Sequence, residues 1–273
     1  MSWSKKIMDT PIIGDAARKV ASIKANSEAH SIADHFTQYL EPELALTPKS
    51  REEVFQIRHN VYCDELNFLP THQSGLETDS FDAHSELALI KHKPSNIYTG
   101  CIRVVKSSDS SEQMPIEYYC GDSMQHDQFH PRYFKRGEIC EFSRLAVKNQ
   151  FRRRKNDRFT GSATGVISET TYSETELRCF PFIAIGLYMT AATIAIESGI
   201  NHAFVMMEPR LARSMQFVGI KFEQIGPAIE YHGKRAPYYI NADMFLNNLS
   251  NGFQSLFLEI NKTINQQILS SGN

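Results

Sequence analysis

Residues 138–147 read EICEFSRLAV, residues 181–198 read PFIAIGLYMTAATIAIES, and residues 203–207 read AFVMM. The first stretch alternates like a half-buried strand, the second is an apolar run of helix length, and the third is a short buried strand. Alternation divides the first strand into two faces, each with a charged group: Cys140, Phe142 and Arg144 on one, and Glu141, Ser143 and Leu145 on the other.

The elements on either side extend this pattern. Upstream, we expect an amphipathic helix that begins near an N-cap at Ser50 and carries Arg58 on or near its apolar face, followed by a hairpin. Downstream, a second helix starts at Glu208-Pro209 and ends before Gly219. The hairpin strands are SELALIKH at 85–92 and TGCIRVVK at 99–106, and a further strand is expected at 221–231.

The chain divides into one main domain and two end segments. Residues 1–48 are expected to form an N-terminal helical arm, with a helical patch at 32–40 that breaks before Pro42. Residues 49–246 form the main domain. Residues 247–273 have apolar side chains at helical spacing and predict a C-terminal amphipathic helix that packs on the body, on a second copy as a homodimer, or on a membrane surface.

Composition excludes several classes of protein. A formal net charge of −2 over 273 residues is not that of a nucleic-acid-binding protein. The N-terminal MSWSKKIMDTPIIG contains no apolar run of signal-peptide length, and the apolar stretch at 180–196 is too short to cross a bilayer, so no transmembrane segment is expected. Five cysteines without CxxC spacing indicate reduced thiols in a cytoplasmic protein.

Six blocks follow one another along the main domain. They are RxxVFxxRxxVY at 51–62, ETDSFD at 77–82, GCIR at 100–103, EFSRLAV at 141–147, EPRLAR at 208–213 and IGPAIEYHG at 225–233. Over about residues 50–246 the sequence resembles the N-acyl amino acid synthase and acyl-homoserine-lactone synthase branch of the GNAT-fold acyltransferases. The last two blocks most resemble the acyltransferases associated with PEP-CTERM/exosortase systems.

The resemblance implies a fold and an activity. The fold is α+β, an α/β/α sandwich with a mixed, mostly antiparallel sheet whose two central parallel strands splay apart. The activity is N-acyl transfer from the thioester of acyl carrier protein or CoA to the amine of an amino acid or related small molecule. The implied donor is an acyl-phosphopantetheine thioester used as a substrate, and no permanently bound cofactor and no metal are expected.

The resemblance also places six charged residues at the family's active-site positions: Arg58, Asp79, Asp82, Arg103, Glu141 and Arg144. Buried charges are costly unless they are paired, so we expect these groups to meet one another. The ordinary alternative is an ion-pair network that only fastens the first helix to the sheet. So many charges in otherwise apolar segments favour a site.

Thioester aminolysis suggests a role for each group. Glu141 is the candidate general base, directly or through a water, unless it only pairs with Arg103 or Arg58. Arg103 or Arg144 is a candidate to hold the acceptor carboxylate through a two-point guanidinium contact. Asp79 and Asp82 are expected to orient a cationic amine.

Two further groups of residues are expected to hold the donor. Arg152, Arg153 and Arg154 suit the phosphate of phosphopantetheine or the acidic surface of an acyl carrier protein, although such a run is also typical of a solvated face. Phe142 and Ser143 are expected to contact substrate. The helix at 182–196, where Gly186 and Ala191 leave room, is predicted to line an acyl pocket that opens near Glu141, with a filled core as the alternative.

Other functions remain open. An acyl-homoserine-lactone synthase would use S-adenosylmethionine, but such enzymes usually carry a Trp after the first Arg helix, where this chain reads ELNFLP at 65–70; its one Trp is Trp3. A non-catalytic acyl-binding signalling module is a second alternative. A covalent mechanism through Cys140 or Cys179 is disfavoured because no His stands beside either, and His232 fits a turn better than acid/base chemistry.

Overall fold

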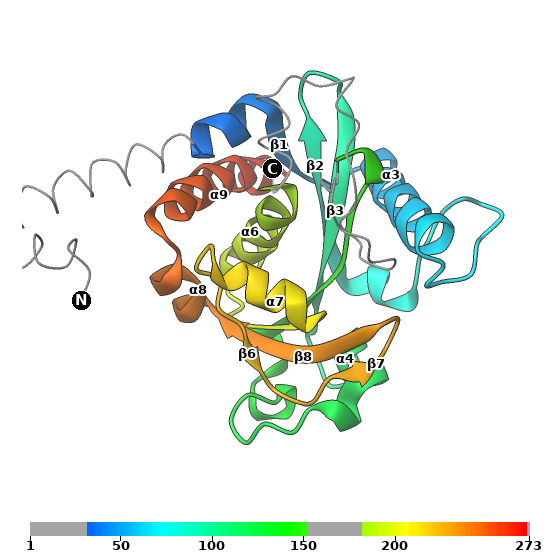
Figure 1. The fold of residues 1–273 in the computed structure, drawn as a ribbon, viewed down its shortest axis with the longest axis vertical. Helices are drawn as coiled ribbons and strands as arrows, with labels where there is room; N and C mark the ends of the chain where they lie inside the picture. Colours follow the sequence, from blue (N-terminus) through cyan, green and yellow to red (C-terminus); the bar gives the residue numbers. More distant parts are fainter. Residues whose placement is uncertain (1–31, 152–181, 272–273) are drawn as a thin grey trace, which may run out of the picture.

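A single mixed sheet forms the centre of the computed structural model, which describes residues 32–151 and 182–271. The strands lie in the order β1-β2-β3-β4-β5-β8-β6, and β7 pairs with β8. Figure 1 shows this sheet between two groups of helices. The strands are β1 (Leu40–Leu44), β2 (Ser85–His92), β3 (Ile97–Lys106), β4 (Ile139–Val147), β5 (His202–Met207), β6 (Glu223–Gln224), β7 (Ile229–Glu230) and β8 (Lys234–Asn241).

Helices cover both faces of the sheet. On one face α3 (Pro48–Arg58) packs against β2, β3 and β4. On the other face α6 (Ile183–Glu197) crosses the same strands, and α9 (Asn251–Ser271) packs on α6 and β1. The shorter helices are α4 (Pro115–Cys120), α7 (Pro209–Gln216) and α8 (Ala242–Asn248). The predicted α+β sandwich is confirmed.

The N-cap of α3 lies three residues before the predicted one. Thr47, not Ser50, is the N-cap: its Oγ1 accepts a hydrogen bond from the Ser50 amide at 3.1 Å, and the Ser50 hydroxyl accepts one from the Thr47 amide at 3.0 Å. Pro48 then occupies the first helical position, where its missing N–H costs nothing. A π-helical segment, His59–Glu65, follows Arg58 directly.

The strands β4 and β5 run parallel and then separate. Their pairing extends from Ile139 opposite His202 to Phe142 opposite Val205. Beyond that point β4 continues for five residues without β5 as a partner, while β3 still pairs with it on the other side. The splay predicted from the resemblance is therefore present.

A β-bulge shifts the faces of β4 in its second half. Cys101 lies opposite Ala146 but Arg103 lies opposite Ser143, so β4 has one residue more than β3 in this interval. Arg144 takes up the irregularity with φ +52°, a left-handed conformation that is rare outside glycine. The strict alternation predicted for this strand is therefore wrong at Arg144, whose side chain shares a cavity with Glu141 and Ser143 rather than packing beside Phe142.

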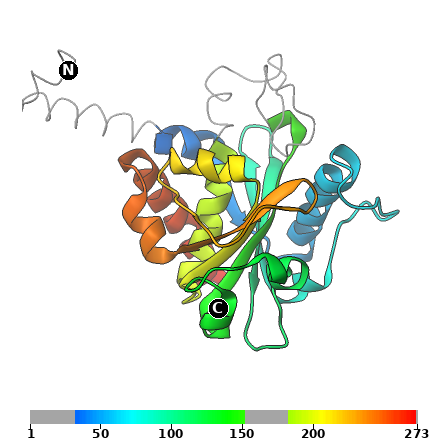
Figure 2. The same cartoon turned by 60° about the horizontal axis from the view of Figure 1, so that its bottom comes forward.

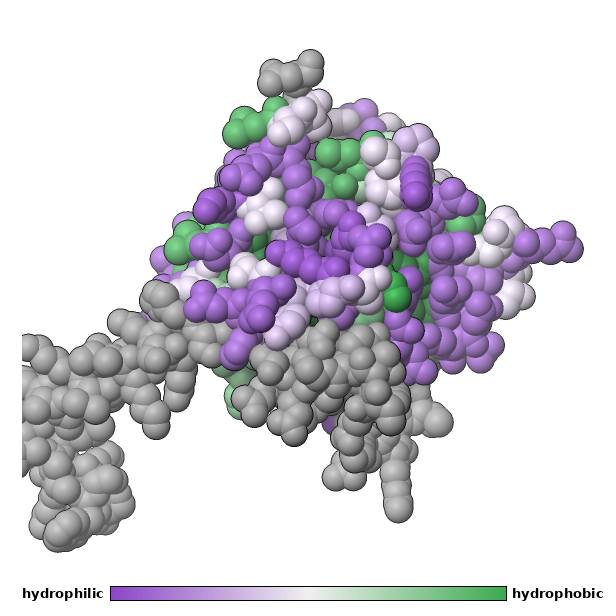
Figure 3. Space-filling view, turned by 90° about the horizontal axis from the view of Figure 1, so that it is seen from above, coloured by the Kyte–Doolittle hydropathy of each residue, from purple (hydrophilic) through white to green (hydrophobic). Residues whose placement is uncertain are grey.

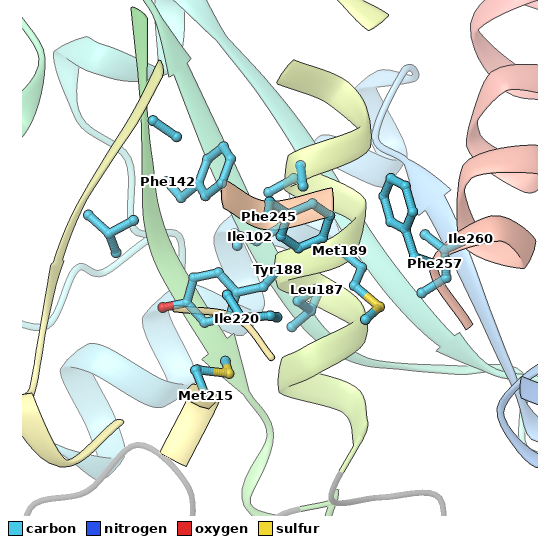
Figure 4. Packing of buried hydrophobic residues seen from close by; sticks show 14 of the residues in the cluster. Ile102, Phe142, Leu187, Tyr188, Met189, Met215, Ile220, Phe245, Phe257 and Ile260 are labelled. Atoms are coloured by element: carbon cyan, nitrogen blue, oxygen red, sulfur yellow. The ribbon is translucent and has the colours of Figure 1, made fainter. Parts of the chain in front are cut away.

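The larger core lies between the sheet and the helices α6 and α9. In Figure 4 Tyr188 extends from α6 toward β4, while Met189 points to the opposite side of the helix, toward Phe257 and Ile260 of α9. Leu187, which precedes both in sequence, is fully buried. Much of the surface seen from above is hydrophilic (Figure 3).

The edge strand β1 was not predicted. Residues 32–39 are helical, as expected, but Leu40–Leu44 then pairs antiparallel with β2. Pro42 is accommodated because an edge strand needs fewer backbone donors. A side chain of α9 covers this edge: the Gln267 amide accepts a hydrogen bond from the Leu44 N–H at 2.8 Å and donates one to the Pro42 carbonyl at 2.9 Å.

The single strand predicted for 221–231 is wrong. Gly226 and Pro227 divide this segment into β6 and β7, and β8, which was not predicted, supplies the pairing for both. The β7–β8 hairpin lies beside residues 107–138 below β4 and β5 (Figures 1 and 2), and the Gln125 amide donates to the Ile225 carbonyl at 2.8 Å.

Four cysteines are free and buried: Cys63, Cys101, Cys120 and Cys140. Cys179 lies outside the described residues. Within the described parts of the chain, no helix combines the length and the apolar character needed to cross a bilayer.

Candidate active site

A network of buried ion pairs joins α3 to the ends of β3 and β4. Arg58, the last residue of α3, is fully buried; its Nε donates to Glu77, and its Nη1 lies 2.6 Å from Oδ1 of Asp82. Arg103 of β3 is also fully buried, with Nη1 at 2.5 Å from Asp79 and 2.9 Å from Asp82. These contacts fix the relative position of helix and sheet.

Arg144 completes the network from the bulge of β4. Its Nη2 lies 3.0 Å from Oε1 of Glu77 and 3.1 Å from Oδ2 of Asp79. The bulge is what allows this, because regular alternation would direct the side chain to the core around α6. The ring of Tyr62 lies 5.8 Å from the Arg144 guanidinium.

The local backbone places the two aspartates. Asp79 caps a short 3₁₀ turn, Ser80–His84, by accepting a hydrogen bond from the Phe81 amide at 3.0 Å, and Asp82 accepts one from the Asp79 amide at 2.8 Å. This reciprocal cap follows from the ETDSFD sequence, since Asp readily accepts bonds from nearby amides. Both carboxylates are thereby held toward the arginines.

Glu77 is the member of the network that the sequence analysis missed as a site residue. It is 2% exposed and binds both Arg58 and Arg144. Burial raises the pKa of Glu77, but the guanidinium groups of Arg144 and Arg58 outweigh it and hold that pKa below its usual range. Its position at the head of the ETDSFD block was the available signal.

Glu141 is not in the network, contrary to the expectation that all six charges meet. It is 2% exposed, and its Oε2 accepts a hydrogen bond from the Ile116 amide at 2.6 Å, in the first turn of α4. No salt bridge joins it to Arg103 or Arg58 in the described structure. Burial raises the pKa of Glu141 to about 8, although the Ile116 amide, Arg103 and Arg144 act in the opposite direction.

A polar cavity of about 50 Å³ lies in front of Glu141, at the point where β4 and β5 separate. Among the described residues, Arg144 is the one member of the ion-pair network that lines it. Besides β4, the cavity is lined by the segment that follows α3, by α4, by β5 and by the β7–β8 hairpin. They contribute Tyr62, Phe68 and Leu69; Pro115, Ile116 and Cys120; and Met206, Tyr231, His232 and Arg235, beside Glu141, Ser143 and Arg144 of β4.

An apolar cavity of about 30 Å³ lies on the opposite face of the sheet. Phe142 lines it with α6, and the small residues involved are Ala192 and Ala195 rather than the expected Gly186 and Ala191. That an acyl chain occupies such a pocket stays a prediction. Gly186 instead lies against Phe36, whose ring would be 2.7 Å from an added Cβ, so the expectation that it widens a pocket is wrong. Glu141 does not line this cavity.

The remaining predicted residues are distributed as follows. Ser143 lines the polar cavity and accepts a hydrogen bond from Arg103 Nε at 3.1 Å. His232 occupies the turn of the β7–β8 hairpin with φ +48°, at the edge of the same cavity. Arg152, Arg153 and Arg154 lie outside the described residues. In the parts of the chain that are described, no three His, Cys, Asp or Glu side chains are grouped as metal ligands.

Residues 57–161 match the family described as the acetyltransferase (GNAT) domain, which is less than half of the chain. The match contains β2, β3 and β4 with the bulge, and therefore most of the ion-pair network. The fold is GNAT-like. No curated protein matches the chain.

Solved structures share this fold at low sequence identity. TofI, in a ternary complex with an inhibitor and MTA, aligns with a TM-score of 0.55 and 12% identity over 80% of this chain and 99% of its own. MesI, described as a CoA-dependent acyl-homoserine lactone synthase, gives 0.52 and 15% over 80% and 94%. The AHL synthase LasI gives 0.50 and 12% over 77% and 96%. At these identities the likeness extends to the fold alone.

Proposed function

We propose that the protein is an N-acyltransferase that moves an acyl group from a carrier thioester to the amine of an amino acid. One observation carries this function: Glu141, a buried carboxyl with a pKa near 8, faces a cavity where two parallel strands separate. The matching GNAT acetyltransferase domain and the six sequence blocks support the same reaction class.

The splay provides the place for the thioester. Beyond Phe142, β4 has no partner strand on the β5 side, so backbone amides at this edge are available to a substrate. Amides held in place by β3 form a preorganised set of donors for the oxygen that gains charge as the thioester carbonyl is attacked. The apolar cavity behind Phe142 is the proposed site of the acyl chain.

Glu141 is the proposed general base. The amine nitrogen attacks the thioester carbonyl carbon, the amine proton passes to the Glu141 carboxylate, and the C–S bond breaks. The carrier leaves as a thiolate that takes up this proton from Glu141, which returns the carboxylate to its ionised form. A base with a pKa close to the working pH combines a useful ionised fraction with the driving force to take that proton. At pH 7 about one tenth of Glu141 is ionised for a pKa near 8.

The ion-pair network is proposed to position the reacting groups. It links α3, the 3₁₀ turn, β3 and β4, so Arg144 and the loop that follows Tyr62 keep a fixed distance from Glu141. Asp79 and Asp82 were expected to orient the acceptor amine. Their carboxylates are paired with Arg58, Arg103 and Arg144, which favours a positioning role.

The test is direct. The purified full-length chain is incubated with acyl-CoA and acyl carrier protein thioesters of several lengths, together with each protein amino acid or with S-adenosylmethionine. Thiol release and mass spectrometry of the product are followed. We expect an N-acyl amino acid, formed faster by wild type than by Glu141→Gln and equally by wild type and Glu138→Gln. A product that forms only with S-adenosylmethionine identifies a homoserine-lactone synthase, and absence of turnover in every arm favours a binding module.

A further inference from the structure

The charges around the polar cavity do not balance. The network is neutral, because Arg58, Arg103 and Arg144 are offset by Glu77, Asp79 and Asp82. Glu141 is largely protonated at pH 7, since its pKa is about 8. One more cation lines the cavity: Arg235, the second residue of β8.

Arg235 differs from the other arginines of the site in its partners. Within the described residues no salt bridge connects it to a carboxylate, and its Nε is a buried donor with no hydrogen-bond partner. A guanidinium N–H that is removed from water without a replacement acceptor is destabilising. The neighbouring His232 adds no second cation at pH 7, because burial, Arg235 and Arg144 keep its pKa below the usual value.

The surroundings of Arg235 hold it in place. The β7–β8 hairpin pairs it with Ile229, and the turn at the tip uses the left-handed conformations of His232 and Gly233. Its guanidinium lies 5.7 Å from the ring of Phe68, which also contacts His232 with ring centroids 5.8 Å apart. Stacking on an aromatic ring leaves the edge of a guanidinium available for a planar anion.

We propose that Arg235 binds the carboxylate of the acceptor amino acid and directs its amine toward Glu141; this rests on the function proposed above. The site thus selects an acceptor with a free carboxylate over an amine that has no carboxylate. Arg103 and Arg144 were the expected contacts, but Arg144 is paired with Glu77 and Asp79. Arg103 is paired with Asp79 and Asp82 and, although its Nη2 has no hydrogen-bond partner among the described residues, it does not line the cavity. A planar carboxylate is the acceptor group that matches a single guanidinium in two bonds.

The experiment compares each protein amino acid with its carboxamide, which keeps the shape and removes the charge. For wild type we expect a clear preference for the acid. Arg235→Gln lowers kcat/KM for the acid by about 10–100-fold, as expected for loss of a charge-assisted hydrogen bond. It leaves the carboxamide and the KM of the acyl donor unchanged, and Arg235→Lys restores part of the preference.

The matched control is Lys234→Gln, an exposed neighbour in the same hairpin, which should behave as wild type. An unchanged ratio of acid to carboxamide in Arg235→Gln would overturn the proposal. A raised donor KM with every acceptor would also overturn it, because Arg235 would then bind a phosphate of the donor.

Calorimetric titration of the amino acids and carboxamides without donor separates this inference from the proposed function. If wild type binds the acids more tightly than the carboxamides and Arg235→Gln does not, the carboxylate site stands even where no acyl transfer is detected. If wild type binds acids and carboxamides equally, or binds neither, the inference about Arg235 fails whatever the acyltransferase assay shows.

Discussion

Replacing Glu141 with Gln tests the general base through two independent measurements. The amide oxygen of Gln can still accept the hydrogen bond from the Ile116 N–H, so the variant keeps the contact that ties β4 to α4. It loses only the group that titrates. We therefore expect a folded protein whose rate falls by about 10²–10⁴-fold, the usual contribution of a positioned base.

The first measurement is the pH dependence of the rate. For wild type kcat/KM should rise as Glu141 loses its proton, with a midpoint near pH 8. The acceptor amine titrates identically for both proteins, so the ratio of wild-type to variant rate isolates the carboxyl. That ratio should rise through pH 8 and level above it.

The second measurement is the pH dependence of the free energy of unfolding. Folding raises the pKa of Glu141 from 4.5 to about 8, so between these values the folded state holds a proton that the unfolded state has lost. The free energy of unfolding of wild type then falls relative to Glu141→Gln by about 1.4 kcal/mol for each pH unit in this window. Urea denaturation at pH 5, 7 and 9 measures the difference.

The control is Glu138→Gln, since Glu138 lies next to β4 but its side chain is 40% exposed and paired with Lys135 at 3.2 Å. It should change neither the rate nor the pH dependence. A wild-type rate for Glu141→Gln at saturating acceptor would refute the assignment of the base. Equal stability differences at pH 5 and pH 9 would refute the reasoning on burial.

Three further predictions address the network, the apolar cavity and the carrier. Glu77→Ala leaves Arg58 and Arg144 without a shared partner and should lower the free energy of unfolding by about 3–5 kcal/mol. Lys106→Ala, whose ion pair with Glu86 is partly solvent-exposed, should lower it by under about 1 kcal/mol. Equal losses for the two variants in urea denaturation would refute a stabilising network. Ala192→Leu should shift donor preference toward shorter acyl chains in competition assays. Ala191→Leu, at a buried position away from the cavity, should not shift it. An unshifted preference in Ala192→Leu would mean that the cavity is only part of the core. Replacing the arginines at 152–154 with Ala should raise the apparent KM for acyl carrier protein and weaken its salt dependence, and an unchanged KM at low ionic strength would make them a solvated face.

The sequence was informative where one pattern determined one element. The alternation of 138–147 predicted β4, and the apolar run of helix length after it predicted α6. A helix that is buried on most sides leaves an unbroken apolar run rather than a period. The buried position of Arg58 followed in the same way from helical spacing. The resemblance then supplied the splay, which no local pattern specifies.

The sequence misled where a single residue changed the geometry. The bulge at Arg144 inverts the face of one side chain, and nothing in EFSRLAV distinguishes a bulged strand from a regular one. Glu77 therefore lies in the ion-pair network where Glu141 was expected: the bulged Arg144 reaches Glu77, while α4 supplies Glu141 with a backbone amide. Arg235 stands beside Lys234 in a polar hairpin, which reads as solvated charge until the tertiary structure shows what it faces.

The side chain of Gln267 has a practical consequence for handling the protein. By bonding to both the Leu44 amide and the Pro42 carbonyl, it occupies the open edge of the sheet at β1 in the way a further strand would. A truncation that removes the last turns of α9 would uncover a template for strand addition, although it lies far along the chain from any catalytic candidate. Shortened variants should therefore end after 267, and the self-association of shorter ones would report an exposed sheet edge rather than a natural oligomer.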